Sequence, residues 1–199
     1  VIKTGAETVY SVEVEHALPP RTPRYDRTAI LYPVQPRRRG AALGIYRRGT
    51  HQVEPMRDCR VQQRALTTFG RLAADVIQRH GVPAYDDRTG EGVLRAIRAR
   101  VMPSTRELLV GAVATTNKFP RRDALVRDLA EAARGLRDDQ GRPLQLVGAV
   151  LNVNERPGNA LLGPHTQALH GHAWQRDEVG ELVLRVSFGS FYQLHRHAE

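Results

Sequence analysis

The stretch Gly92-Val-Leu-Arg-Ala-Ile-Arg-Ala-Arg-Val-Met102, followed by Pro103-Ser104 and then Glu107-Leu-Leu-Val-Gly-Ala-Val-Ala114, predicts two strands separated by a turn. An amphipathic helix is predicted before this pair, over residues 61–80, and another after it, over residues 123–137. Both segments place apolar side chains at intervals of three and four residues. Helices mixed with hairpin-linked strands predict an α+β fold, with a mainly antiparallel sheet and two amphipathic helices.

Shorter patterns predict further strands along the chain. They cover residues 29–32, 43–46, 52–54, 145–153, 159–162, 168–169 and 181–186. Near the N-terminus, residues 8–14 alternate like a strand, and the prolines at 19, 20 and 23 then predict a stiff linker.

The composition is that of a globular protein with a basic surface. The chain has 199 residues, of which 41% are hydrophobic and 26% are charged. Lys and Arg number 30 against 21 Asp and Glu, and the resulting net charge of +9 favours a polyanionic partner such as nucleic acid. The one cysteine, Cys59, excludes an internal disulfide and fits a cytoplasmic setting. No apolar run approaches the roughly 20 residues of a membrane helix, so we expect no membrane association. We also expect a monomer.

Familiar motifs for bound groups are missing from the sequence. It has no Gly-rich nucleotide loop and no CxxC or HExxH pattern. Five histidines suggest a metal site, and with it a hydrolase: His165, His170, His172, His195 and His197. Against this interpretation, no cysteine or carboxylate stands near them at the spacing of metal ligands. Cys59 precedes a predicted helix, where a thiol ionises more easily, so it is a nucleophile, a metal ligand or, as position alone favours, a small buried residue.

Three longer stretches occur in a telling order: Leu43-Gly-Ile-Tyr-Arg-Arg-Gly-Thr-His-Gln-Val-Glu-Pro-Met-Arg-Asp-Cys59, Val147-Gly-Ala-Val-Leu-Asn-Val-Asn-Glu-Arg-Pro-Gly-Asn-Ala-Leu-Leu-Gly163 and Val186-Ser-Phe-Gly-Ser-Phe-Tyr-Gln-Leu-His195. With Gly92-Val-Leu-Arg95 and Leu169-His-Gly171, the chain resembles the RNA 5-methyluridine methyltransferase family. Members of this family use S-adenosylmethionine to methylate C5 of uridine in rRNA and tRNA. The resemblance runs from about residue 27 to the end of the chain.

The resemblance implies a domain layout. Full-length members often carry an OB-like RNA-binding domain with three cluster cysteines, then a central α+β domain, then a Rossmann-like methyltransferase domain. Residues 1–24 would then be a linker or the end of a preceding region, residues 25–186 the central domain, and residues 187–199 the start of a truncated catalytic domain. The catalytic cysteine, the cofactor loop and the base would lie outside these residues, so we expect no catalytic residue here and no activity from the chain alone.

Residues near the C-terminus match the family's Phe-x-Gln-x-Asn segment. Gln193 matches the glutamine that contacts the cofactor, and a side-chain amide both donates and accepts hydrogen bonds. Phe191 matches the aromatic residue near the target base, which is suited to stacking on an extruded uracil. His195 stands where the family usually has Asn, and Tyr192 where Phe or another apolar residue is common. Without the resemblance, core packing would be favoured for Phe191 and Tyr192.

Residues of the first quoted stretch match a basic hairpin and a cluster ligand. Arg47, Arg48 and His51 are either a solvated turn or contacts to RNA phosphates. Cys59 matches the cysteine that supplies the fourth thiolate of a 4Fe-4S cluster in cluster-bearing members, and four thiolates are the usual complement. By this match it is not the nucleophile of methyl transfer.

The implied reaction begins when a thiolate adds to C6 of uracil. C5 then attacks the methyl group of S-adenosylmethionine, a base removes the C5 proton, and the thiolate leaves. We expect a fragment of such an enzyme, acting on 23S rRNA, because the Cys59 segment resembles cluster-bearing members that include ribosomal enzymes. The alternative is a non-enzymatic RNA-binding module derived from this family, which the net charge and the missing nucleophile favour.

Overall fold

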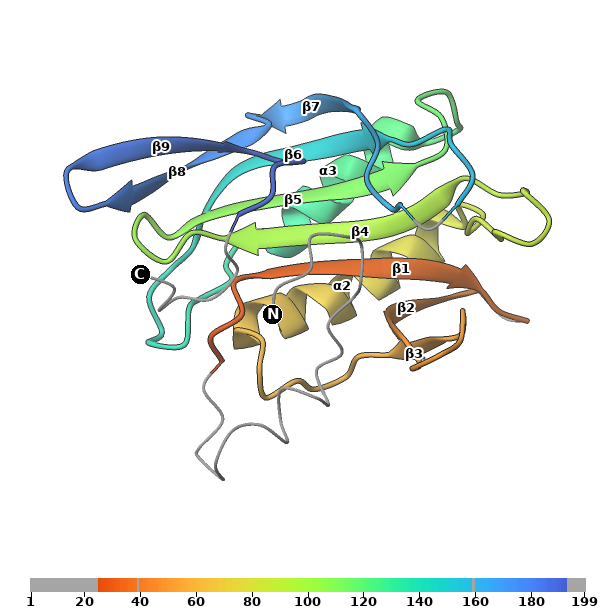
Figure 1. Ribbon diagram of the computed structural model, residues 1–199, viewed down its shortest axis with the longest axis horizontal. Helices are drawn as coiled ribbons and strands as arrows, with labels where there is room; N and C mark the ends of the chain where they lie inside the picture. The colour runs from red at the N-terminus through yellow and green to blue at the C-terminus, as the bar shows by residue number, and fades with distance from the viewer. Residues whose placement is uncertain (1–24, 39, 159, 193–199) are drawn as a thin grey trace.

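A seven-stranded mixed sheet forms the centre of the molecule in a computed structural model that describes residues 25–38, 40–158 and 160–192 (Figure 1). The strand order is β3-β2-β1-β4-β5-β6-β7. The strands are β1 (Ala29–Pro36), β2 (Ala41–Tyr46), β3 (Val53–Pro55), β4 (Leu94–Val101), β5 (Glu107–Ala114), β6 (Gln145–Val153) and β7 (His165–Gly171). Among the described strand pairs, β5 and β6 run parallel and the others antiparallel. A separate hairpin consists of β8 (Trp174–Val179) and β9 (Leu182–Ser187).

Two helices cover one face of this sheet (Figure 1). Helix α2 (Arg64–His80) links β3 to β4, and α3 (Arg122–Ala133) is the crossover that a parallel β5–β6 pair requires. Helix α2 ends at Gly81, whose φ of 62° is the left-handed cap conformation that glycine adopts most easily. Neither helix of the described residues has the length and apolarity needed to span a bilayer.

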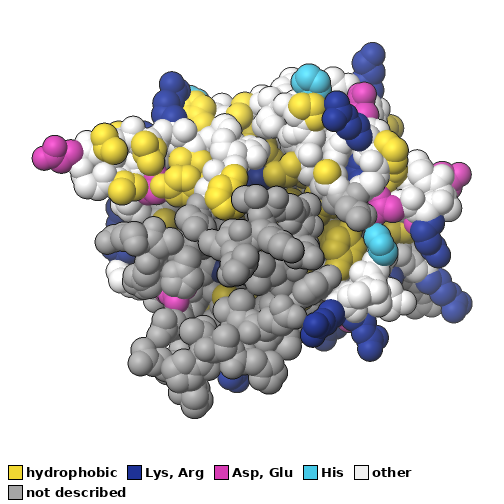
Figure 2. All heavy atoms as spheres, in the orientation of Figure 1, with side chains coloured by type: hydrophobic (Ala, Val, Ile, Leu, Met, Phe, Trp, Pro, Cys, Tyr) yellow, Lys and Arg dark blue, Asp and Glu magenta, His cyan; other side chains and the backbone are white. Residues whose placement is uncertain are grey.

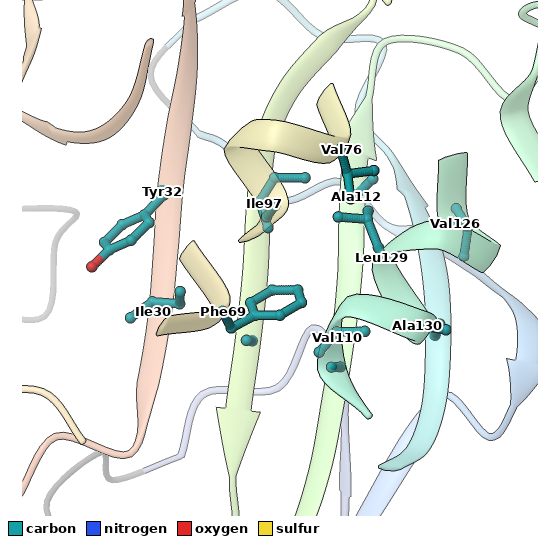
Figure 3. Packing of buried hydrophobic residues seen from close by; sticks show 14 of the residues in the cluster. Ile30, Tyr32, Phe69, Val76, Ile97, Val110, Ala112, Val126, Leu129 and Ala130 are labelled. Carbon is teal, nitrogen blue, oxygen red and sulfur yellow. The ribbon is translucent and has the colours of Figure 1, made fainter. Parts of the chain in front are cut away.

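The main core lies between the helices and the sheet. Figure 3 shows Phe69 and Val76 of α2 and Leu129 of α3 against Ile97 of β4 and Val110 of β5. All five side chains are at most 1% exposed. Because side chains alternate along a strand, this packing sends the neighbours of Ile97 and Val110 to the opposite face of the sheet.

The predicted α+β class and mainly antiparallel sheet are confirmed, with shifted boundaries. Strand β1 continues beyond residue 32, through Pro33 to Pro36. It pairs with β4 up to Pro33 and with β2 from Val34 onward, so the proline, which has no N–H, falls where the partner changes.

Within the described residues, one predicted strand is absent from the structure, and one observed strand has no counterpart in the prediction. Residues 160–162 of the segment predicted as a strand are not in one, because the carbonyls of Ala160 and Leu161 accept hydrogen bonds from the side-chain amide of Asn154. Strand β8 was not predicted, since Gln-Arg-Asp-Glu in its middle lacks an apolar alternation. The strand predicted at residues 8–14 lies outside the described residues.

Candidate functional site

The chain that follows β9 crosses the sheet face opposite the helices (Figure 1). Phe188 is its anchor and is 2% exposed. Its ring packs with Leu109 and Val150 of the sheet, and its backbone N–H donates to the carbonyl of Ala173 at 2.8 Å. This segment contains Phe191, the aromatic residue of the Phe-x-Gln pattern, so its placement decides how that side chain is presented.

Two buried arginines of β4 lie under this segment. Arg100 is 1% exposed, and its guanidinium donates to the carbonyls of Val186 at 3.0 Å and Ser187 at 2.8 Å. Arg98 is 8% exposed and lies with its guanidinium carbon 5.3 Å from the centre of the Phe188 ring. Burial lowers the pKa of Arg98 to about 10, and burial together with the nearby positive charge of Arg98 lowers the pKa of Arg100 to about 10.

Phe191 is displayed on the outside of the anchored segment. It is 90% exposed, whereas Tyr192 is half-buried and donates its hydroxyl proton to the carboxylate of Asp177 on β8. Burial, together with the bond to Asp177, raises the pKa of Tyr192 to about 12, so this hydroxyl remains a donor at neutral pH. The inward positions 188 and 192 therefore turn the Phe191 ring toward solvent.

The basic hairpin is the turn that connects β2 to β3 (Figure 1). Arg47, Arg48 and His51 are all exposed. The turn is closed by the Arg47 N–H, which donates to Gln52 O at 2.7 Å, and it includes Gly49, whose φ of 68° is left-handed. The structure thus presents the three predicted side chains together on one turn.

A second projecting hairpin, β8–β9, has a different surface. Its apolar side chains Val179, Leu182 and Val183 are about half exposed or more, at 49%, 64% and 64%. Figure 2 shows hydrophobic side chains gathered over this hairpin, at the left of the view. Its tip therefore adds little to the core of the described residues.

Sequence comparison finds homologues named as RNA methyltransferases, while no family model matches the chain. The chain is 28% identical over 185 residues to an uncharacterised RNA methyltransferase of Oceanobacillus iheyensis, covering 92% of this chain and 38% of that protein. A Bacillus cereus protein of the same description is 27% identical, with the same coverage of both chains. This chain is an RNA methyltransferase homologue. It spans 38% of the length of these curated relatives.

A comparison with solved structures finds a known enzyme that is similar in fold to this chain. The crystal structure of Pyrococcus abyssi tRNA (uracil-54, C5)-methyltransferase in complex with S-adenosyl-L-homocysteine matches with a TM-score of 0.63 and 15% sequence identity. The match covers 88% of this chain and 38% of that one. At this identity the likeness establishes a shared fold.

Two motif stretches of this RNA methyltransferase homologue meet at Arg95. Its guanidinium donates to the carbonyls of Asn154, at 3.2 Å, and Gly158, at 2.8 Å, and lies 4.6 Å from the centre of the Tyr85 ring. Arg95 is 3% exposed. The Gly92–Arg95 stretch therefore supports the loop after β6, a structural role that sequence reasoning did not assign.

The remaining predicted site residues are placed differently or lie outside the described part. Gln193 and His195 are outside the described residues. Cys59 is partly buried between β3 and α2, and within residues 25–38, 40–158 and 160–192 no group of three or more His, Cys, Asp or Glu side chains is arranged to hold a metal. One thiol does not fit a four-thiolate cluster, so the described chain by itself does not provide one.

Proposed function

We propose that this chain is part of an S-adenosylmethionine-dependent RNA (uracil-C5)-methyltransferase, in which it supplies contacts to RNA and to the cofactor. The observation that carries the proposal is Phe191, 90% exposed on a segment that is fixed to β4 of the sheet before it and to β8 of the separate hairpin after it. The named homologues, and a fold shared with a tRNA (uracil-54, C5)-methyltransferase, support the reaction class.

Phe191 acts in this proposal as a stacking platform for the target base. A uridine must leave its helical stack before an enzyme reaches C5. An aromatic side chain stabilises an unstacked base by about 1–3 kcal/mol, which offsets part of the cost of unstacking. Gln193, two residues further on, is proposed to contact the methyl donor.

The hairpin residues Arg47, Arg48 and His51 are proposed to hold RNA phosphates. Phosphate contacts fix the register of the RNA and provide most of the salt-dependent affinity. We propose 23S rRNA as the substrate, with tRNA as the comparison in the test below. The catalytic cysteine and the base that removes the C5 proton are expected in the rest of a longer protein, since this chain spans 38% of the length of its relatives.

The proposal is tested by release of tritium from C5 of uridine. Transcripts of 23S rRNA and of tRNA, labelled with tritium at uridine C5, are incubated with S-adenosylmethionine and the longest natural protein that contains this chain. C5 methylation replaces the C5 hydrogen, so tritium enters the solvent at the rate of the reaction. We expect release from the rRNA transcript, and a strong decrease for Phe191→Ala with RNA affinity largely retained.

Other results would change the assignment. Methyl transfer without tritium release would overturn C5 of uracil as the target, and release from tRNA alone would overturn the rRNA substrate. Salt-sensitive RNA binding without any methyl transfer would favour the RNA-binding module instead, for which the net charge of +9 is the specific support.

A further inference from the structure

We propose that Arg100, assisted by Arg98, is a positioning residue that holds Phe191 at a fixed place over the sheet. This inference rests on the proposed function and extends it to residues that do not touch the substrate. Its basis is a set of bonds between β4 and a segment nearly 90 residues further along the chain.

Arg100 uses its planar guanidinium as a clamp. Besides Val186 O and Ser187 O, it lies 3.5 Å from Ser190 O, and its Nε donates to Gln175 Oε1 at 2.8 Å. The amide of Gln175 in turn donates to the backbone carbonyls of Arg100, at 2.9 Å, and Glu107, at 2.8 Å. Donors in a rigid fork fix the direction of each bond, which an ammonium on a flexible stem does not.

The electrostatic cost of this arrangement indicates that it serves more than packing. Arg98 and Arg100 carry like charges on one face of β4. Among the described residues, no carboxylate oxygen lies within 4 Å of a guanidinium nitrogen of either arginine. The negative charge of Asp177 acts on Arg100, but not as an ion pair within 4 Å. Burying a charge without a close opposite partner is expensive, whereas apolar side chains would fill this face at no such cost. What the arginines add is a fixed path for the carbonyls of residues 186, 187 and 190.

Phe191 lies between two fixed points. On one side, Ser190 O lies 3.4 Å from Arg98 and 3.5 Å from Arg100. On the other side, Tyr192 is held by Asp177, which also accepts a hydrogen bond from Ser104 in the β4–β5 turn. The exposed ring therefore has little freedom to move with its backbone, as a stacking platform requires.

The test compares lysine substitutions, which keep the positive charge but lose the planar guanidinium with its fixed N–H directions. In the longest natural protein that contains this chain, Arg100→Lys is expected to lower kcat for tritium release about 10- to 100-fold, with KM for RNA little changed, because small misplacements near the reacting base are costly. Arg98→Lys keeps a cation over the Phe188 ring and is expected to have a much smaller effect. Arg71→Lys, on the exposed side of α2, is the matched control and should leave kcat unchanged.

Hydrogen exchange provides a readout that does not depend on activity. The amides of Phe188 and Ser190 donate to Ala173 O and Ser187 O, and both should exchange faster in Arg100→Lys while the amides of β4 stay protected. If Arg100→Lys fails to fold, Tyr192→Phe removes the second fixed point and is expected to lower kcat in the same way.

Each contrary result would overturn a different part of the inference. Unchanged exchange in residues 186–192 of Arg100→Lys would overturn the anchoring role, and faster exchange with an unchanged kcat would overturn positioning. A wild-type protein without tritium release would contradict the proposed function, and with it positioning for catalysis, while the exchange data would still decide whether Arg100 anchors the segment.

Discussion

The guanidinium carbon of Arg98 lies 5.3 Å from the centre of the Phe188 ring, on the sheet face that the two helices leave free. Three residues later, Phe191 is 90% exposed, whereas Phe188 is 2% exposed. The two phenylalanines stand in one short sequence, Phe-Gly-Ser-Phe, yet one belongs to the core and the other to the surface. This difference makes them a matched pair for separating stability from function.

Phe188→Ala should destabilise the fold, and Phe191→Ala should not. Removing a buried phenylalanine typically costs about 3–5 kcal/mol, because the lost contacts leave a cavity. A substitution at an exposed position usually changes the free energy of unfolding by less than about 0.5 kcal/mol. Urea unfolding, followed by the fluorescence of the single tryptophan, Trp174, measures both values. Equal losses in the two variants would contradict the described burial.

The close contact of Phe188 with Gly111 gives a second prediction. A Cβ added at Gly111 would lie 2.6 Å from Val150 Cγ2, 2.7 Å from Val150 O and 2.9 Å from Phe188 Cε2. Because one of these atoms belongs to the backbone, Gly111→Ala should cost about 1–3 kcal/mol through overpacking. Gly189→Ala is the control, since nothing lies within 4 Å of its added Cβ. A stability of Gly111→Ala equal to that of the control would contradict the packing of the segment on β5.

Elements with a clear period were predictable from sequence. The helix predicted over residues 61–80 is α2, and the apolar runs at 107–114 and 145–153 are β5 and β6 with the same bounds. Their patterns are strong because each element buries a full face or both faces against the rest of the fold. Strand β8 lacked such a pattern, since Gln175 and Asp177 are buried through hydrogen bonds and not through apolar contacts.

The site was predictable only where it is local. A turn with glycine predicts that Arg47 and Arg48 are exposed, and they are. The burial of Arg98 and Arg100 was not predictable, because alternate arginines on a strand suggest a solvated face. It depends on carbonyls from residues 186–190, and contacts at that sequence separation leave no trace in local periodicity.

Replacement of the hairpin arginines should weaken RNA binding without affecting the fold. Arg47→Gln with Arg48→Gln is expected to reduce the salt dependence of binding by roughly one phosphate contact for each arginine. The control removes the same two charges from exposed positions on other elements, at Arg71 of α2 and Arg134 just after α3. Titration of a labelled rRNA transcript at several salt concentrations gives both slopes. Equal slopes in the two double variants would mean that the hairpin acts through net charge alone.

The contact between the two helices should make stability depend on pH in the acid range. Asp128 Oδ2 of α3 lies 2.9 Å from His80 Nε2 at the end of α2, and the hydrogen bond from His80 lowers the pKa of Asp128 below its ordinary value of 3.8. A carboxyl group whose pKa is lower in the folded state stabilises the fold when it is ionised, so this contribution is complete above the ordinary value and is lost as the pH falls through the folded value. Asp128→Asn removes it at all pH values.

Urea unfolding of wild type and Asp128→Asn therefore gives a signed test. The wild type should be more stable than the variant at about pH 6, and the difference should shrink as the pH falls below the ordinary value of 3.8 and Asp128 takes up a proton. Asp75→Asn makes the same change on the exposed side of α2 and should have a smaller effect at about pH 6. A difference between wild type and Asp128→Asn that grows as the pH falls below 3.8 would show that the His80 contact does not favour the ionised carboxylate.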